Sequence, residues 1–121
     1  MDGSFFWHMV TAVFANWYDA KMLIERAGTV STDALHVLAG VLVQLLVATL
    51  LRRPLASWLP WLVVLAAILF NEGVDFWAER WPSLAMQLSE SAKDVVLTLF
   101  LPTALMLALR ASPTLRAARR R

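Results

Sequence analysis

The sequence predicts an all-α integral membrane protein, a bundle of three transmembrane helices preceded by an amphipathic helix at the membrane surface. Of its 121 residues, 60% are hydrophobic and only 17% are charged, a balance typical of polytopic membrane proteins. The hydrophobic residues gather in three long runs, which short polar segments separate. We therefore treat residues 1–121 as one membrane domain. The absence of cysteine excludes disulfides and thiolate metal sites.

Residues 4–26 form the predicted interfacial helix. Apolar side chains recur here at three- and four-residue spacing, and His8, Asp19, Lys21 and Glu25 interrupt them. The segment is rich in aromatic residues, which suit the headgroup region of a bilayer. We expect this helix to lie flat on the membrane, and a true span is the alternative.

The first two predicted spans cover residues 33–51 and 57–81. Ser31 and Asp33 offer N-cap oxygens for the first span, which Pro54 and the two arginines before it bring to an end. Its apolar run of eighteen residues is about 27 Å long, enough to cross the hydrocarbon core. The loop that follows is short, so the two spans are expected to be antiparallel neighbours.

The third predicted span covers residues 90–110. We expect Pro82 to end the second span, residues 83–90 to form a polar connector, and Ser89 or Ser91 to cap the third. Pro102 lies within this span, where it leaves the carbonyl of Thr98 without its helical donor. Residues 111–121 form a basic tail.

The distribution of positive charge predicts the orientation in the membrane. With three spans, the side that holds the tail and the first loop carries seven basic residues and no acid: Arg52, Arg53, Arg110, Arg116, Arg119, Arg120 and Arg121. The other side carries four: Lys21, Arg26, Arg80 and Lys93. Since basic residues favour the cytoplasmic side, we expect the N-terminus outside and the C-terminus inside.

Polar residues on all three predicted spans fall at the same depth, near the outer membrane boundary. We therefore predict a polar pocket whose candidate catalytic or ligand residues are His36, Glu72, Asp75 and Asp94, lined also by Gln44, Asn71 and Thr98. In this pocket His36 would be a base or ligand and the carboxylates acids or ligands. Clustered acids raise one another's pKa or recruit a cation, so Glu72, Asp75 and Asp94 are candidate ligands of a divalent metal ion. The alternative is that these groups only hold the helices together by hydrogen bonds.

One resemblance rests on three short motifs within residues 33–110. Asp33-x-x-His36 opening a membrane helix, Glu72-x-x-Asp75 closing the next and Asp94-x-x-x-Thr98 opening the last resemble the pattern of the VanZ-like family of small bacterial membrane proteins. That family has Gln at the place of Asp75 and Asn at the place of Thr98. The resemblance implies a multi-pass protein of the bacterial inner membrane, linked to the cell envelope, whose biochemistry is undefined.

A second resemblance is to prokaryotic diacylglycerol kinase. A surface helix followed by three spans, with Asn71-x-x-x-Asp75 and Ala92-Lys93-Asp94, is similar to that family and implies a lipid kinase. The family has a glutamate one turn before the asparagine, where this chain has Ile68. The metal-binding carboxylate pair is therefore incomplete, and the predicted orientation puts the site outside, away from ATP.

Two classes of function stay open at this point. The first is a site, catalytic or not, that binds an envelope lipid headgroup or a cation, and the second is an accessory or structural subunit of a larger membrane complex. No phosphate-binding glycine loop or HExxH motif is present in the sequence. We expect membrane lipids as partners, together with a homo-oligomer or another membrane protein, and no nucleic acid, because a basic tail beside a membrane meets anionic lipid.

Overall fold

The computed structural model describes residues 3–112 and 114, and these form helices and no strand. In chain order the helices are α1 (Gly3–Ala27), α2 (Thr32–Leu50), α3 (Trp58–Ala78) and α4 (Leu84–Ala111). The last three are long and apolar enough to cross a membrane. The predicted fold class, an all-α membrane bundle of three spanning helices with an amphipathic N-terminal helix, is confirmed. The predicted basic tail from residue 115 onward lies outside the described residues.

A serine hydroxyl caps the start of each spanning helix. Ser31 Oγ accepts from the Ala34 amide at 3.2 Å, Ser57 Oγ from the Leu59 amide at 3.3 Å, and Ser83 Oγ from the Met86 amide at 3.2 Å. Such caps satisfy amides that have no partner inside the helix.

The cap at Ser83 corrects two predicted boundaries. Helix α4 begins at Leu84, so most of the predicted connector over residues 83–90 is helical. Helix α3 ends at Ala78 rather than at residue 81, because Glu79 is extended (φ −93°, ψ 151°). The turn that follows is closed locally by Trp81 Nε1, which donates to Glu79 Oε2 at 2.8 Å. The true connector is therefore only residues 79–83.

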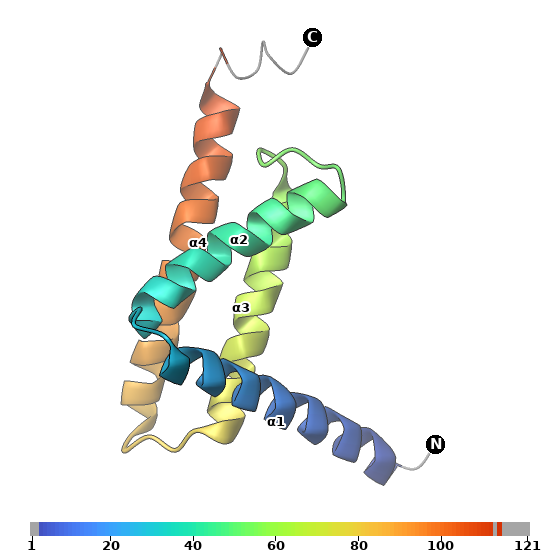
Figure 1. Cartoon of the computed structure of the whole chain (residues 1–121), viewed down its shortest axis with the longest axis vertical. Helices are drawn as coiled ribbons and strands as arrows, with labels where there is room; N and C mark the ends of the chain where they lie inside the picture. The colour runs from blue at the N-terminus through green and yellow to red at the C-terminus, as the bar shows by residue number, and fades with distance from the viewer. Residues whose placement is uncertain (1–2, 113, 115–121) are drawn as a thin grey trace.

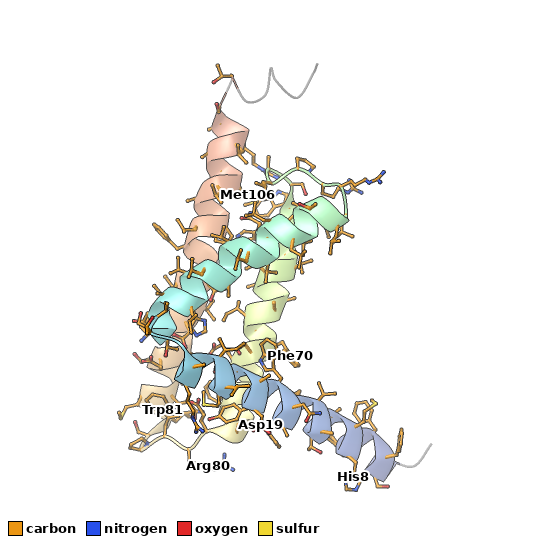
Figure 2. The ribbon with its side chains drawn as sticks, viewed as in Figure 1. His8, Asp19, Phe70, Arg80, Trp81 and Met106 are labelled. Carbon is orange, nitrogen blue, oxygen red and sulfur yellow. The ribbon has the colours of Figure 1, made fainter. Side chains whose placement is uncertain are left out.

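The three spanning helices pack against one another, and α1 packs on α3. Figure 1 shows α1 lying across one end of the bundle, the end where the α3–α4 connector also lies; we call this the α1 end. The α2–α3 connector and the C-terminus lie at the opposite end (Figure 1). Between them runs a small apolar core, to which Met106 contributes from α4 (Figure 2).

Helices α2 and α4 approach each other closely at Gly40. A Cβ atom on Gly40 would overlap the carbonyl oxygen of Thr98. This is the carbonyl that loses its helical donor because Pro102 has no N–H group. A small residue opposite a proline in a neighbouring helix therefore lets the two backbones come together.

Helix α1 docks through aromatic side chains and leaves the rest of its surface exposed. Phe14 makes edge contacts with Phe70 and Trp77, with ring centroids 5.6 and 5.8 Å apart, and none of the α1 residues is buried. Figure 2 shows Phe70 where α1 crosses α3, and His8 on the part of α1 that projects from the bundle. A helix with aromatic residues exposed and lying across the spans suits the membrane interface.

Candidate functional site

The seven residues predicted to form the pocket are the seven polar or charged residues that the described part of the chain buries. They are His36, Gln44, Asn71, Glu72, Asp75, Asp94 and Thr98. Helical periodicity explains this outcome, since each lies on the face that its helix turns toward its neighbours. The structure brings six of them together at the α1 end; we call these six the polar cluster.

His36 connects α2 to α4 through both ring nitrogens. Its Nδ1 lies 3.1 Å from Thr98 Oγ1, and its Nε2 lies 3.4 Å from Asp94 Oδ2. If Nδ1 carries the proton and donates it to Thr98, Nε2 is left with a free lone pair facing the carboxylate. His36 is then suited to act as a base or as a metal ligand.

Glu72 of α3 faces the same point from the third spanning helix. One ligand atom each from His36, Glu72 and Asp94 lies within 4.8 Å of the others, and all three residues are buried. Asn71 Nδ2 donates to Glu72 Oε1 at 3.2 Å and so fixes that carboxylate. Of the three carboxylates predicted as metal ligands, Glu72 and Asp94 lie in this group with His36, and Asp75 does not.

Asp75 is instead paired with α1. Lys21 Nζ donates to Asp75 Oδ2 at 2.5 Å. Burial alone would lower the pKa of Lys21, but the hydrogen bond with Asp75 and its negative charge more than offset this, and the pKa lies above its ordinary 10.5. Lys21 is thus fully charged at neutral pH and neutralises one of the three clustered acids.

Trp17 and Lys21 are the two site residues that sequence reasoning missed. Trp17 Nε1 donates to Asn71 Oδ1 at 3.1 Å, one turn along α1 from the Lys21 contact with Asp75. A signal for this match was present, since Trp17 and Lys21 are four residues apart, as are Asn71 and Asp75. Two facing pairs with the same helical spacing can dock two helices in one register.

Gln44 is the predicted pocket residue that lies apart from the polar cluster. It is about two helical turns beyond His36, is 0% exposed, and donates from Nε2 to the carbonyl of Pro102 at 3.0 Å. This contact links α2 to α4 without a charged group. Gln44 is therefore an interhelical hydrogen-bonding residue in this structure.

Two cavities adjoin the polar cluster from different sides. The larger, of about 240 Å³, lies between α1, α2 and α3 and is partly open; most of its wall is apolar, with Lys21, His36, Asn71 and Thr98 among its polar residues. The smaller, of about 20 Å³, lies between α3 and α4. Its lining includes five carboxylates: Glu72, Asp75, Glu79, Glu90 and Asp94. The cluster thus separates an apolar cavity from an acidic one.

Comparison with known proteins gives no match to a family model, a curated protein or a solved structure. The resemblances to the VanZ-like family and to diacylglycerol kinase therefore stay predictions. What the site can do chemically follows from its own residues: it can hold a cation between an imidazole and two carboxylates, and it can hydrogen-bond a polar group that enters from the larger cavity.

Proposed function

We propose that this chain is a VanZ-like protein of the bacterial inner membrane that binds an envelope lipid, with the lipid headgroup against the polar cluster. The observation that carries this proposal is the 240 Å³ cavity, which is apolar along its walls and polar at the cluster. A cavity with this division of surface suits an amphiphile, and the molecules that surround a membrane helix bundle are amphiphiles.

The two parts of the cavity would bind two parts of the lipid. Leu35, Ala39, Val43, Val64, Ala67 and Ile68 supply the apolar wall. This volume is below the roughly 300–1,000 Å³ of sites that enclose a whole drug-sized ligand. The site would therefore hold the headgroup and the start of one acyl chain, while the rest of the lipid stays in the bilayer. Lys21, which lines the cavity and has N–H donors beyond the one that it gives to Asp75, would hydrogen-bond the headgroup.

The proposal places the α1 end at the outer face of the membrane. Arg52 and Arg53 follow α2, and Arg110 lies in the last turn of α4, so the described basic residues of the opposite end support a cytoplasmic location for that end. A phosphatase reporter fused before Met1 should be active outside the cell, and one fused after Arg121 should be inactive. The reverse pattern would contradict the proposed orientation.

A pair of neighbouring alanines on α3 tests the lipid site. Ala67 lines the cavity, whereas the adjacent Ala66 does not, and both are exposed in the isolated chain. In native mass spectrometry of gently purified protein, the parental chain and Ala66→Phe should retain a lipid, and Ala67→Phe should lose most of it.

Equal lipid retention by both variants would contradict a lipid site in this cavity. Release of a lipid-free chain together with a second membrane protein would favour the accessory-subunit alternative instead. Lipids of known headgroup, added back in nanodiscs, would then identify the class that Ala67→Phe excludes.

A further inference from the structure

His36, Glu72 and Asp94 come from three different helices and converge on one point. Their ligand atoms lie within 4.8 Å of one another. Atoms bound to a single metal ion at about 2.0–2.2 Å lie roughly 3–4 Å apart. Small rotations of the side chains would therefore close the three residues around an ion, without movement of the helices.

Asp94 provides an observation that points to a ligand. The residue is 8% exposed, and its Oδ1 atom is buried with no hydrogen-bond partner in the described part of the chain. A buried carboxylate oxygen without a partner is unfavourable unless a cation or water satisfies it. The cavity of about 20 Å³ beside Glu72 and Asp94 has room for one such occupant, since one water needs roughly 10–15 Å³.

The groups behind the three residues are arranged as in protein metal sites. Thr98 Oγ1 lies at Nδ1 of His36, so the opposite nitrogen faces the carboxylates. Asn71 holds one oxygen of Glu72 and leaves the other free to bind. Metal-bound histidines and carboxylates commonly have such hydrogen-bonding partners, which fix the tautomer and the orientation of the ligand.

We propose that His36, Glu72 and Asp94 bind one divalent metal ion, Mn²⁺ or Zn²⁺, within the polar cluster. With His36 neutral, the two carboxylates carry two negative charges, which a divalent ion cancels. An imidazole with two carboxylates suits a first-row metal better than Ca²⁺ or Mg²⁺, which prefer oxygen ligands alone. Asp75 is outside the set because Lys21 already neutralises it. This site goes beyond lipid binding, because it requires no lipid.

Electron paramagnetic resonance of Mn²⁺ added to the full chain in nanodiscs tests the site. The parental chain should bind one ion per chain, and pulsed spectra should show ¹⁴N coupling from the imidazole of His36. Zn²⁺ should displace the Mn²⁺. Thr98→Val should weaken binding by about 10-fold, the lower end for loss of an outer hydrogen-bonding partner, and His36→Gln, Glu72→Gln and Asp94→Asn, which remove ligands, should each weaken it by more than the upper end of about 100-fold.

The exposed acid Asp33 provides the matched control. Asp33 and Glu90 form a second acidic group with Asp94 near the same helices, and Lys93 pairs with both of them. Asp33→Asn should leave Mn²⁺ affinity within twofold of the parental chain, and so should Ala67→Phe, which would block only the lipid cavity.

The absence of a stoichiometric bound ion, or of ¹⁴N coupling in the parental chain, would overturn the proposal even if the variants failed to fold. Mn²⁺ binding that depends on Asp33 and Glu90 and not on His36 and Glu72 would overturn it too. Loss of lipid in Ala67→Phe without any metal binding would leave the lipid proposal standing and reject this one.

Discussion

The helices of this bundle are joined by polar contacts of two kinds, at different depths. In the middle of the bundle, between His36 and Arg110, the contacts use neutral side chains: Gln44 donates to the Pro102 carbonyl, and Trp61 Nε1 donates to Thr103 Oγ1 at 2.8 Å. At the α1 end they also use charged groups, with Lys21 paired to Asp75 and His36 facing Asp94. Helices α2 and α4 are thus connected once without a charged group and once with one.

This difference indicates that packing does not require the buried acids. Interhelical hydrogen bonds in membranes contribute on average about 0.6 kcal/mol each, and amides or hydroxyls can supply them. A carboxylate at the centre of a membrane helix costs roughly 2.5–3.5 kcal/mol, and less near the interface. Lys21 offsets this cost for Asp75 alone, which supports the proposal that Glu72 and Asp94 bind a ligand.

The largest effect on stability should come from breaking the Lys21–Asp75 pair. Lys21→Met should lower the free energy of unfolding by about 3 kcal/mol, because it leaves the Asp75 carboxylate without its partner. This value is the lower end for the loss of one partner of a buried ion pair, since the Lys21 side chain keeps some exposure. Unfolding of nanodisc-reconstituted protein would measure this. The double variant Lys21→Met/Asp75→Leu should recover most of the loss, and a double variant as unstable as the single one would show that the charges themselves are needed.

The same pair predicts how α1 docking depends on pH. Because docking raises the pKa of Lys21 above 10.5, the ion pair stabilises docked α1 fully below that value and is lost as the pH rises through the raised pKa. Spin-label distances between α1 and α3 should therefore stay constant through neutral pH and lengthen only under alkaline conditions. In Lys21→Met this alkaline transition should be absent. A transition near neutral pH in the parental chain would argue against the pair.

A smaller effect on stability is expected at Gly40, which lies on α2 between His36 and Gln44. Gly40→Ala should lower the free energy of unfolding by about 1–3 kcal/mol, because the new methyl overlaps the Thr98 carbonyl and pushes α2 from α4. Gly73→Ala is the control on α3, where a methyl meets nothing within 4 Å. It should stabilise the helix by about 0.5–1 kcal/mol. Equal effects at the two glycines would disprove the close approach at Gly40.

The smallest effect should come from the neutral contacts. Gln44→Leu removes the hydrogen bond to Pro102 and also an amide oxygen that has no partner in the described part of the chain. We expect a loss of only about 0.6 kcal/mol in the same unfolding measurement. A loss as large as that of Lys21→Met would remove the contrast between the two kinds of contact.

Helical periodicity and the membrane environment made much of this site predictable. Once three helices cross the membrane, their polar residues must face inward, so the buried set from His36 to Thr98 could be named from sequence. The position of Gln44 along the membrane normal was harder to predict. Gln44 lies on the same helix face as His36 but about two turns further along the helix. Ser89 or Ser91 was predicted to cap the third span, and this prediction is wrong, because Ser83 is the cap that starts α4.

The role of α1 could not be predicted with the same certainty. Its docking depends on matching Trp17 and Lys21 to Asn71 and Asp75, which are 54 residues away in each case. Helical periodicity describes each helix face by itself, and it therefore groups Asp75 with Glu72 and Asp94. The lysine that separates Asp75 from them belongs to a helix expected to contact the membrane surface.

The central claim is that Glu72 and Asp94 serve a ligand and not the fold. Its most direct test is the thermal unfolding of the double variant Glu72→Gln/Asp94→Asn with and without Mn²⁺. Amides keep the shape and hydrogen bonding of the carboxylates but remove their charge. Without metal, the variant should unfold at or above the temperature of the parental chain; with Mn²⁺, only the parental chain should be stabilised. Two results together would show that the carboxylates serve the fold: without metal the variant is less stable than the parental chain, and Mn²⁺ does not stabilise the parental chain.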